Sequence, residues 1–154
     1  MQLEPYLDPK NALVLPDCGS LDELMQRLAA HAAPAVGGLD APALMAALLE
    51  REQRHPTSTP EGVAFPHAML NEIEETHVVI ALVRPAVDFG VKGHPKADLV
   101  FCMFGHAGDP VRHVRLLARQ ARIANSPGAL ERLRHAKTPE ELHAQLVDED
   151  RAHG

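Results

Sequence analysis

Two nearly continuous apolar runs constrain the fold of this chain most strongly. They cover residues 77–84 (His-Val-Val-Ile-Ala-Leu-Val-Arg) and 98–104 (Asp-Leu-Val-Phe-Cys-Met-Phe). Each run has the length of a strand and lacks the polar alternation of a strand with one solvated face. Such runs are typical of strands that other elements cover on both faces. The sequence therefore predicts a sheet with these two strands at its centre.

Shorter apolar runs and helix-capping residues surround these strands. Residues 12–15 and 63–65 are predicted as further strands. Helices are expected to begin where a polar residue can cap a first turn or precedes a proline. These starts are Ser20, Asp40, Asp109, Ser126 and Thr138. The predicted order is one strand, two helices, three strands and then helices.

Three details of the helices follow from local sequence. The first helix is expected to break at Ala33-Pro34 and Gly37-Gly38, because proline and glycine disfavour a helix interior. The second is expected to end near Arg54, because the next residue precedes a proline. Helical spacing in the third predicts a buried face made of Val111, Val114, Leu117, Ala118 and Ala121.

The order of elements predicts an α/β fold. The strands 63–65, 77–84 and 98–104 have no clear helices between them, so a fully parallel sheet is not expected. A mixed β-sheet flanked by helices on both faces satisfies the pattern. The length of 154 residues fits a single domain, 1–154, with a core at about 12–147. Residues 148–154 are interpreted as an acidic, solvated tail.

Composition excludes several classes of protein. The net charge of −6 argues against nucleic-acid binding, which requires a basic face. Two cysteines, Cys18 and Cys102, are too few for a disulfide framework and fit a reducing cytosol. The N-terminus lacks the pattern of a signal peptide, and no apolar run reaches the length of a membrane span. A cytoplasmic protein without direct membrane insertion is expected.

The motif with the clearest chemistry is Gly-Val-Ala-Phe-Pro-His at residues 62–67, preceded by the pair Arg51-Glu52. His67 is expected at the end of a short strand, where its imidazole can act as a nucleophile, a metal ligand or a proton carrier. Arg51 lies in the last turn of the second helix and carries a planar cation suited to phosphate oxygens. A phosphate-handling site is one function that this combination favours.

The Arg-Glu pair and the glycine-to-histidine motif resemble the mannitol/fructose-type enzyme IIA domain of the bacterial sugar phosphotransferase system, including its nitrogen-regulatory branch. The resemblance runs from about residue 12 to 147. It implies the enzyme IIA fold, an HPr-like phosphocarrier as phosphoryl donor, no cofactor, and His67 as the phosphorylated residue. It also implies an enzyme IIB or a regulatory target protein as the downstream partner.

The resemblance extends to four further residues. His113 falls in the first turn of the third helix, where backbone N–H groups favour anions, and matches the second active-site histidine of the family. Arg51 is implied to neutralise the phosphoryl group, and Glu52 and Thr57 match family positions in the phosphate site. Ser58 and Pro60 stand where the family usually has glycines, and Glu61 adds a negative charge. This departure predicts a weaker contribution of the 58–61 loop to phosphate binding.

Two alternatives remain beside this interpretation. Ten histidines raise the possibility of a metal site, with His94, His106 and His113 as ligands, but no zinc-type spacing supports it. Within the phosphotransferase reading, the protein either signals through its phosphorylation state or feeds a separate sugar permease as a fructose- or mannitol-specific transport subunit. The nitrogen-regulatory role is favoured, because the loop lacks glycines and the chain has no fused carrier domain.

Overall fold

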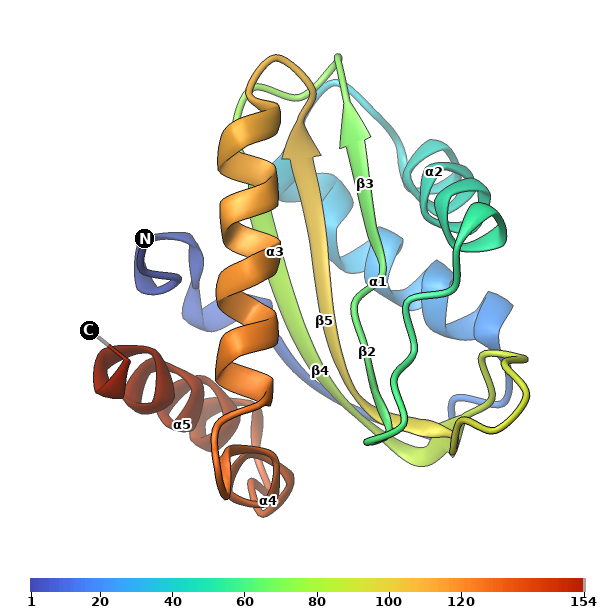
Figure 1. Cartoon of the computed structure of the whole chain (residues 1–154). Helices are drawn as coiled ribbons and strands as arrows, with labels where there is room; N and C mark the ends of the chain where they lie inside the picture. Colours follow the sequence, from blue (N-terminus) through green and yellow to red (C-terminus); the bar gives the residue numbers. More distant parts are fainter. Residues whose placement is uncertain (154) are drawn as a thin grey trace.

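A five-stranded mixed sheet forms the centre of the computed structural model, which describes residues 1–153. The strands are β1 (Ala12–Pro16), β2 (Val63–Ala64), β3 (His67–Leu70), β4 (His77–Val87) and β5 (Ala97–His106). β4 and β5 pair antiparallel, whereas β1 runs parallel to β4, and β2 and β3 run parallel to β5. The mixed sheet predicted from the sequence is confirmed, and β4 and β5 are its two central strands (Figure 1).

The alternation of side chains along β5 explains why its sequence is apolar throughout. Val100, Cys102 and Phe104 point into one buried cluster, and Leu99, Phe101 and Met103 point into a second cluster on the opposite face. Because successive side chains of a strand point to opposite faces, an unbroken apolar run requires a cover on both. All six of these side chains are fully buried.

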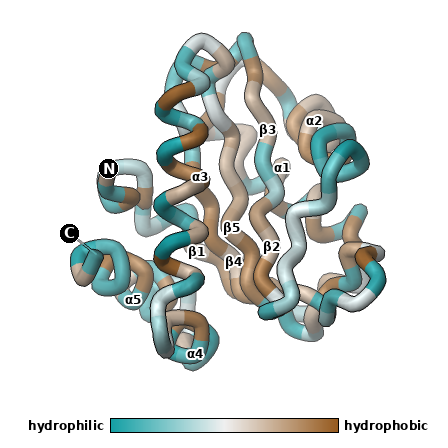
Figure 2. The backbone as a smooth tube through the Cα atoms, viewed as in Figure 1, coloured by the Kyte–Doolittle hydropathy of each residue, from teal (hydrophilic) through white to brown (hydrophobic). Residues whose placement is uncertain are grey.

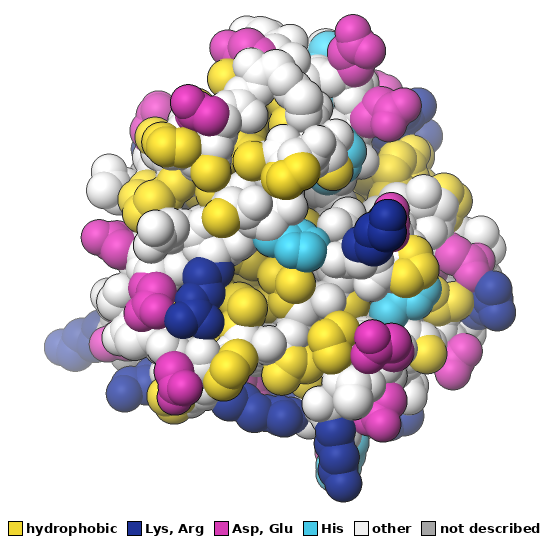
Figure 3. Space-filling model, turned by 180° about the vertical axis from the view of Figure 1, so that it is seen from behind, with side chains coloured by type: hydrophobic (Ala, Val, Ile, Leu, Met, Phe, Trp, Pro, Cys, Tyr) yellow, Lys and Arg dark blue, Asp and Glu magenta, His cyan; other side chains and the backbone are white. Residues whose placement is uncertain are grey.

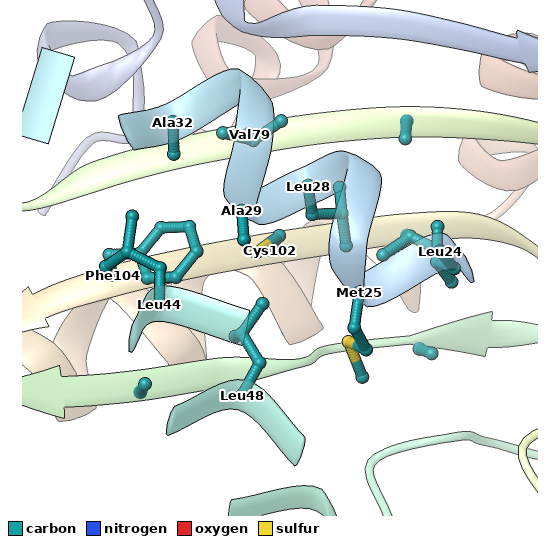
Figure 4. Close-up of a cluster of buried hydrophobic side chains, with 14 of the residues drawn as sticks. Leu24, Met25, Leu28, Ala29, Ala32, Leu44, Leu48, Val79, Cys102 and Phe104 are labelled. Carbon is teal, nitrogen blue, oxygen red and sulfur yellow. The ribbon is translucent and has the colours of Figure 1, made fainter. Parts of the chain in front are cut away.

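Helices α1 (Leu21–Val36) and α2 (Ala41–Arg54) cover one face of the sheet. Leu24, Met25, Leu28, Leu44 and Leu48 from these two helices meet the side chains of β4 and β5 (Figure 4). The predicted caps of these two helices are confirmed, since the Ser20 hydroxyl accepts from the backbone N–H of Glu23 and the Asp40 carboxylate accepts from that of Ala43. The helix start predicted at Ser126 is wrong, because α4 begins at Ala129 after Gly128 and has no side-chain cap.

Helices α3 (Pro110–Ala124), α4 (Ala129–Arg134) and α5 (Pro139–Ala152) cover the other face, together with two short 3₁₀ turns, η1 (Glu4–Tyr6) and η2 (Pro9–Asn11). α3 crosses in front of the sheet in Figure 1, and along the tube in Figure 2 its hydrophilic and hydrophobic residues alternate. No helix in residues 1–153 is both long and apolar enough to span a membrane.

Helix α1 corrects the prediction of a break at Pro34. The helix continues through Pro34 to Val36 and ends at Gly37, whose positive φ of 64° suits glycine. Pro34 is exposed, so water can solvate the carbonyl that lacks its helical donor, and buried Val36 holds the last turn against the core.

Helix α3 corrects the predicted buried face. Val111 and Val114 are 59% and 63% exposed, Ala118 is exposed, and Leu117 is half-buried. The residues that α3 buries are His113, Leu116, Arg119, Gln120 and Ile123. The helical period is correct, but the predicted buried face is rotated about the helix axis from the observed one. The apolar pattern could not indicate the observed face, because three of its five buried side chains are polar.

The acidic tail is also corrected. Residues 148–152 belong to α5, where Glu149 is 4% exposed and Asp150 is completely buried. Asp150 accepts hydrogen bonds from the backbone N–H groups of Leu3 and Glu4 and from Nε of Arg119, at 2.7 to 3.0 Å. These contacts supply the pairing that a buried carboxylate requires. The C-terminal segment is therefore part of the core, together with Leu3 and Leu7 from the N-terminus.

Candidate active site

His67 opens β3 rather than closing a preceding strand. Pro66 has no N–H for the sheet ladder, so the edge strand is divided into β2 and β3, while the Pro66 carbonyl still accepts from the N–H of Met103. The sequence did not reveal β3, because its four residues, His-Ala-Met-Leu, show no clear strand pattern. His67 is thereby held by β5, opposite Met103 in the register.

The ring of His67 is oriented by a hydrogen bond to the backbone. Its Nδ1 lies 2.7 Å from the carbonyl oxygen of Phe65. A carbonyl oxygen only accepts, so Nδ1 carries the proton and the lone pair of the neutral ring is on Nε2. Burial lowers the pKa of His67, the bond to Phe65 opposes that shift, and the charge of Arg51 lowers the pKa further. His67 is therefore a neutral imidazole near pH 7, with its free lone pair on Nε2.

His113 faces His67 from the first turn of α3. The two ring centroids are 5.3 Å apart, with the ring planes inclined at 54°. Asp109 caps α3 by accepting from the N–H of Arg112, which fixes the helix start that carries His113. Gly105 on β5 makes room for the ring, since a Cβ at that position would lie 2.1 Å from Nδ1 of His113.

Both ring nitrogens of His113 are buried and have no hydrogen-bond partner within residues 1–153. Burial, then the neighbouring His67 and Arg51, lower the pKa of His113 to about 4. The ring is consequently neutral at physiological pH, with one N–H and one lone pair. An unpaired buried donor beside a nucleophile is suited to a group that arrives with its own acceptor oxygens.

A cleft of about 770 Å³ brings these side chains together. His67 and Met69 lie on its β3 side, Arg51 and Arg54 come from the last turn of α2, and His113 comes from α3. Nη1 of Arg51 donates to the carbonyl of His55 at 2.8 Å, which keeps the guanidinium at this end of α2. Arg54 was not singled out from the sequence, although its position one turn after Arg51 places it on the same helix face.

Glu52 and Thr57 do not line the cleft. Glu52 is 5% exposed and accepts from both the backbone N–H and the hydroxyl of Thr57, the latter at 2.7 Å. The same hydroxyl oxygen accepts from the N–H of Phe65 at 3.2 Å. Glu52 and Thr57 thus connect the end of α2 to Phe65, the residue whose carbonyl holds the ring of His67.

The loop of residues 58–61 also lies outside the set of residues that line the cleft. The Ser58 hydroxyl bonds Nδ1 of His94 at 2.9 Å, and the carbonyl of Glu61 accepts from Arg134 at 2.6 Å. Pro60 therefore removes no backbone donor from the cleft. The weaker contribution expected from this loop to phosphate binding stays a prediction, and it agrees with the absence of residues 58–61 from the cleft lining.

His94, His106 and His113 do not form the metal site considered from the sequence. In residues 1–153 no group of three or more His, Cys, Asp or Glu side chains lies close enough to hold a metal ion. The residues that do converge are two neutral histidines, one of which has a free ring lone pair on Nε2, and two guanidinium groups. This combination is suited to binding and attacking an anionic electrophile.

Comparison with known proteins identifies the family. Residues 5–149 match the family described as "Phosphoenolpyruvate-dependent sugar phosphotransferase system, EIIA 2". A nitrogen regulatory protein of Bradyrhizobium diazoefficiens is 28% identical over 147 residues, which is 96% of this chain and 95% of that protein.

Solved structures share the fold. The nitrogen regulatory protein IIA-Ntr of Neisseria meningitidis superposes with a TM-score of 0.85 at 21% identity, covering 94% of this chain and 98% of that one. The complex of enzyme IIAMtl with phosphorylated enzyme IIBMtl from Escherichia coli contains a chain that matches with a TM-score of 0.75 at 21% identity, covering 92% and 97%. With the family match spanning nearly the whole sequence, this chain belongs to the EIIA type 2 family of the phosphoenolpyruvate-dependent sugar phosphotransferase system.

Proposed function

We propose that the protein is a phosphoryl carrier that accepts a phosphoryl group on Nε2 of His67 from an HPr-like phosphocarrier. The observation that carries this proposal is the hydrogen bond from Nδ1 of His67 to Phe65, because it leaves the lone pair on Nε2 in a cleft lined by Arg51 and His113. Membership of the EIIA family supports the same chemistry.

The transfer step is an exchange between two imidazole nitrogens. The N–P bond of the donor phosphohistidine breaks as a new N–P bond forms at Nε2 of His67, and the bonding electron pair stays on the donor nitrogen. Nδ1 keeps its proton, so the Phe65 carbonyl stabilises the positive charge that bond formation brings to the ring.

Arg51 and His113 stabilise the charge that accumulates on the phosphoryl oxygens. The Arg51 guanidinium provides a fixed cation, and the N–H of His113 can donate to an oxygen held on His67, since it has no other partner in residues 1–153. The rings of His67 and His113 are 5.3 Å apart, so a phosphoryl dianion on His67 favours the protonated form of His113. Phosphorylation therefore raises the low pKa of His113. His113 is then protonated, and its positive charge holds the phosphoryl group on His67.

We propose the nitrogen-regulatory role rather than sugar transport. Relatives named nitrogen regulatory protein match this chain over nearly their whole length, at 28% and 27% identity. A phosphoryl group adds about two negative charges at the cleft, enough to change which partner surface fits over it. Transport through a separate enzyme IIB is the second candidate, supported by the fold shared with the IIA chain of the mannitol IIA–IIB complex.

Phosphorylation is tested by incubating the protein with phosphoenolpyruvate, enzyme I and HPr. The wild type gains one acid-labile phosphoryl group, and His67→Ala gains none. His135→Ala, which changes an exposed histidine at the end of α4, is the matched control and labels as the wild type does. A label that persists in His67→Ala contradicts the assignment.

The regulatory role is tested with the phosphorylated protein and the His67→Ala variant as baits in parallel pull-downs, beside a sugar-phosphorylation assay with membranes of the source cell. A partner that binds one state and not the other supports regulation. Efficient delivery of phosphate to a sugar, without a state-dependent partner, supports the transport role instead.

A further inference from the structure

The ring of His67 is oriented by one backbone carbonyl, that of Phe65, so a group that fixes Phe65 also fixes the ring. The side chain of Phe65 stacks on Phe101, with 5.4 Å between the ring centroids. Its backbone N–H is shared between the hydroxyl and the carbonyl oxygen of Thr57, at 3.2 and 3.3 Å. The backbone of Phe65 is therefore oriented by a residue eight positions earlier in the chain.

Glu52 in turn holds Thr57. One oxygen of the Glu52 carboxylate accepts from the backbone N–H of Thr57, and the other accepts from its hydroxyl at 2.7 Å. Glu52 follows Arg51 near the end of α2. The loop that orients the ring of His67 is thus attached to the same helix that brings Arg51 to the cleft.

Glu52 differs from the other buried carboxylates. Residues 1–153 contain three of them, Glu52, Glu149 and Asp150. Glu149 and Asp150 each pair with an arginine, whereas Glu52 forms no ion pair in this range. Acidic side chains at the surface are solvated by water, as the magenta side chains in Figure 3 show for the face seen from behind. Burial of a carboxylate without a cation costs free energy, so its retention at this position indicates a role beyond stability.

The residue after Thr57 gives the loop a second attachment. Ser58 is 7% exposed, pairs with Ala64 as an isolated β-bridge, and bonds through Oγ to Nδ1 of His94 at 2.9 Å. His94 lies in the loop between β4 and β5, so this contact is independent of α2. A glycine at position 58 would have no hydroxyl for this bond.

We propose that Thr57 is a positioning residue of the phosphotransfer reaction and that it acts through Phe65 on the proton of His67. Glu52 and Ser58 hold Thr57 in this role. The inference rests on the proposed function. It assigns Thr57 an effect on the nucleophile in place of the phosphate contact that the family resemblance implies, and it agrees with the absence of Thr57 from the cleft lining.

The effect on the nucleophile follows from the two tautomers of a neutral imidazole. With the Phe65 carbonyl in place, the proton is on Nδ1 and Nε2 has the lone pair. If this carbonyl turns away, the proton can occupy Nε2 instead, and Nε2 then has no lone pair for attack on phosphorus. The rate of transfer should therefore follow the fraction of molecules that carry the proton on Nδ1.

The first measurement is the tautomer of His67 in the unphosphorylated protein, read from the ring nitrogens by NMR at about pH 8, where the ring is neutral. The wild type should show Nδ1–H. Thr57→Val, which lacks the hydroxyl, should show a mixture of both tautomers, and Thr57→Ser should restore the wild-type spectrum. Thr59→Val is the matched control, because its hydroxyl in the same loop bonds the carbonyl of Val63 and not Phe65.

The second measurement is the rate of transfer from phospho-HPr. Thr57→Val should be about tenfold slower at saturating phospho-HPr, because the nucleophile is misaligned. The phospho-HPr concentration that gives half the maximal rate should not change, since Thr57 does not line the cleft. Glu52→Gln and Ser58→Ala should lower the rate less, because each removes one support of Thr57. Thr57→Ser and Thr59→Val should transfer as the wild type does.

The two readouts together decide the proposal. It is supported if the rate and the Nδ1–H fraction fall together across the variants. A slow Thr57→Val with the wild-type ring spectrum overturns it, as does Thr57→Val with the wild-type rate. Urea denaturation checks the fold, and if Thr57→Val is unfolded, Glu52→Gln decides by the same two readouts. A wild type that takes up no phosphoryl group contradicts the proposed function alone, because the ring spectrum reports the effect of Thr57 without any transfer.

Discussion

Two regions of the molecule bury polar side chains. One is the junction at which α3, α5 and the N-terminal segment meet, and there the buried charges of Asp150 and Arg119 are paired. The other is the cleft between α2 and α3, and there buried His113 has no partner in residues 1–153. At the junction, the Asp150 carboxylate meets Arg119 at 2.7 Å and two backbone N–H groups. In the cleft, both ring nitrogens of His113 lack a partner in the described residues. One helix, α3, contributes to both regions.

Paired buried groups contribute to stability, whereas a buried group without a partner indicates a functional site. A buried polar group without a partner costs free energy, so a fold that retains one needs a compensating reason. At the junction the pairing holds three distant segments together. In the cleft the missing partner is supplied, in our proposal, by the phosphoryl group. The four predictions below test this comparison from the largest expected effect to the smallest.

Asp150→Ala should cause the largest loss, about 3–5 kcal/mol in the free energy of unfolding, because it leaves the Arg119 guanidinium buried without its carboxylate. Urea denaturation measures the loss. Asp148→Ala is the matched control, since Asp148 is exposed on the same helix and should change stability little. Equal losses in the two variants would mean that the junction does not stabilise the fold through this pair.

His113→Ala should slow phosphotransfer to His67 by about 10²–10³-fold, because the donor to the developing phosphoryl charge is lost while the nucleophile remains. Rapid-quench labelling from phospho-HPr measures the rate, and circular dichroism checks that the fold persists. His135→Ala should label at the wild-type rate. An unchanged rate in His113→Ala would return His113 to a structural role.

Gly105→Ala should slow the same transfer by about tenfold, and cost about 1–3 kcal/mol of stability, by overpacking the site of the His113 ring. The new Cβ would lie 2.1 Å from Nδ1 of His113, so the ring has to move. Gly19→Ala is the control, because its Cβ would meet only the carboxylate end of Glu23, at 3.2 Å. Wild-type kinetics in Gly105→Ala would show that the position of the His113 ring is not critical.

The pH dependence of stability should give the smallest effect near pH 6, where the protonation of His113 in the unfolded chain costs less than about 1 kcal/mol. The pKa of His113 is lowered from 6.5 to about 4, so the unfolded chain binds its proton first as the pH falls. The stability associated with neutral His113 is present above about pH 6.5 and is lost as the pH falls towards 4. NMR titration of the ring and urea midpoints across this range measure it. His113→Gln should flatten that part of the curve, whereas an NMR pKa near the ordinary value would contradict the buried, uncharged state.

The local signals in the sequence predicted the parts of the fold that depend on neighbouring residues. Asp109 and Thr138 cap α3 and α5 through their side chains, as their spacing indicated. The unbroken apolar runs of β4 and β5 identified the central strands, because no other position in a sheet tolerates apolar residues on both faces. His67 and Arg51 were proposed from their motif and His113 from the family resemblance, and the structure places all three in one cleft.

Patterns of neighbouring residues could not predict which distant group each polar side chain contacts. The phase of α3 was misassigned because its buried face contains Arg119, which is acceptable there only beside an aspartate 31 residues later. The same pairing explains why residues 148–152, predicted as an acidic tail, form the end of α5 with Asp150 buried. Glu52 and Thr57 matched family positions, but their mutual hydrogen bonds place them behind the cleft wall, and Arg54 enters the cleft instead.

The sequence by itself determined the helix starts at Ser20, Asp40, Asp109 and Thr138 and the two central strands, and it singled out the candidate histidines and arginine of the cleft. Those features rest on interactions within a few residues of each other or on hydrophobicity, which each residue carries with it. The tertiary structure decided which helix face is buried, which ionisable groups are paired, and which are left open. These outcomes depend on groups far apart in the chain, since a charge is buried or exposed according to what the fold places beside it.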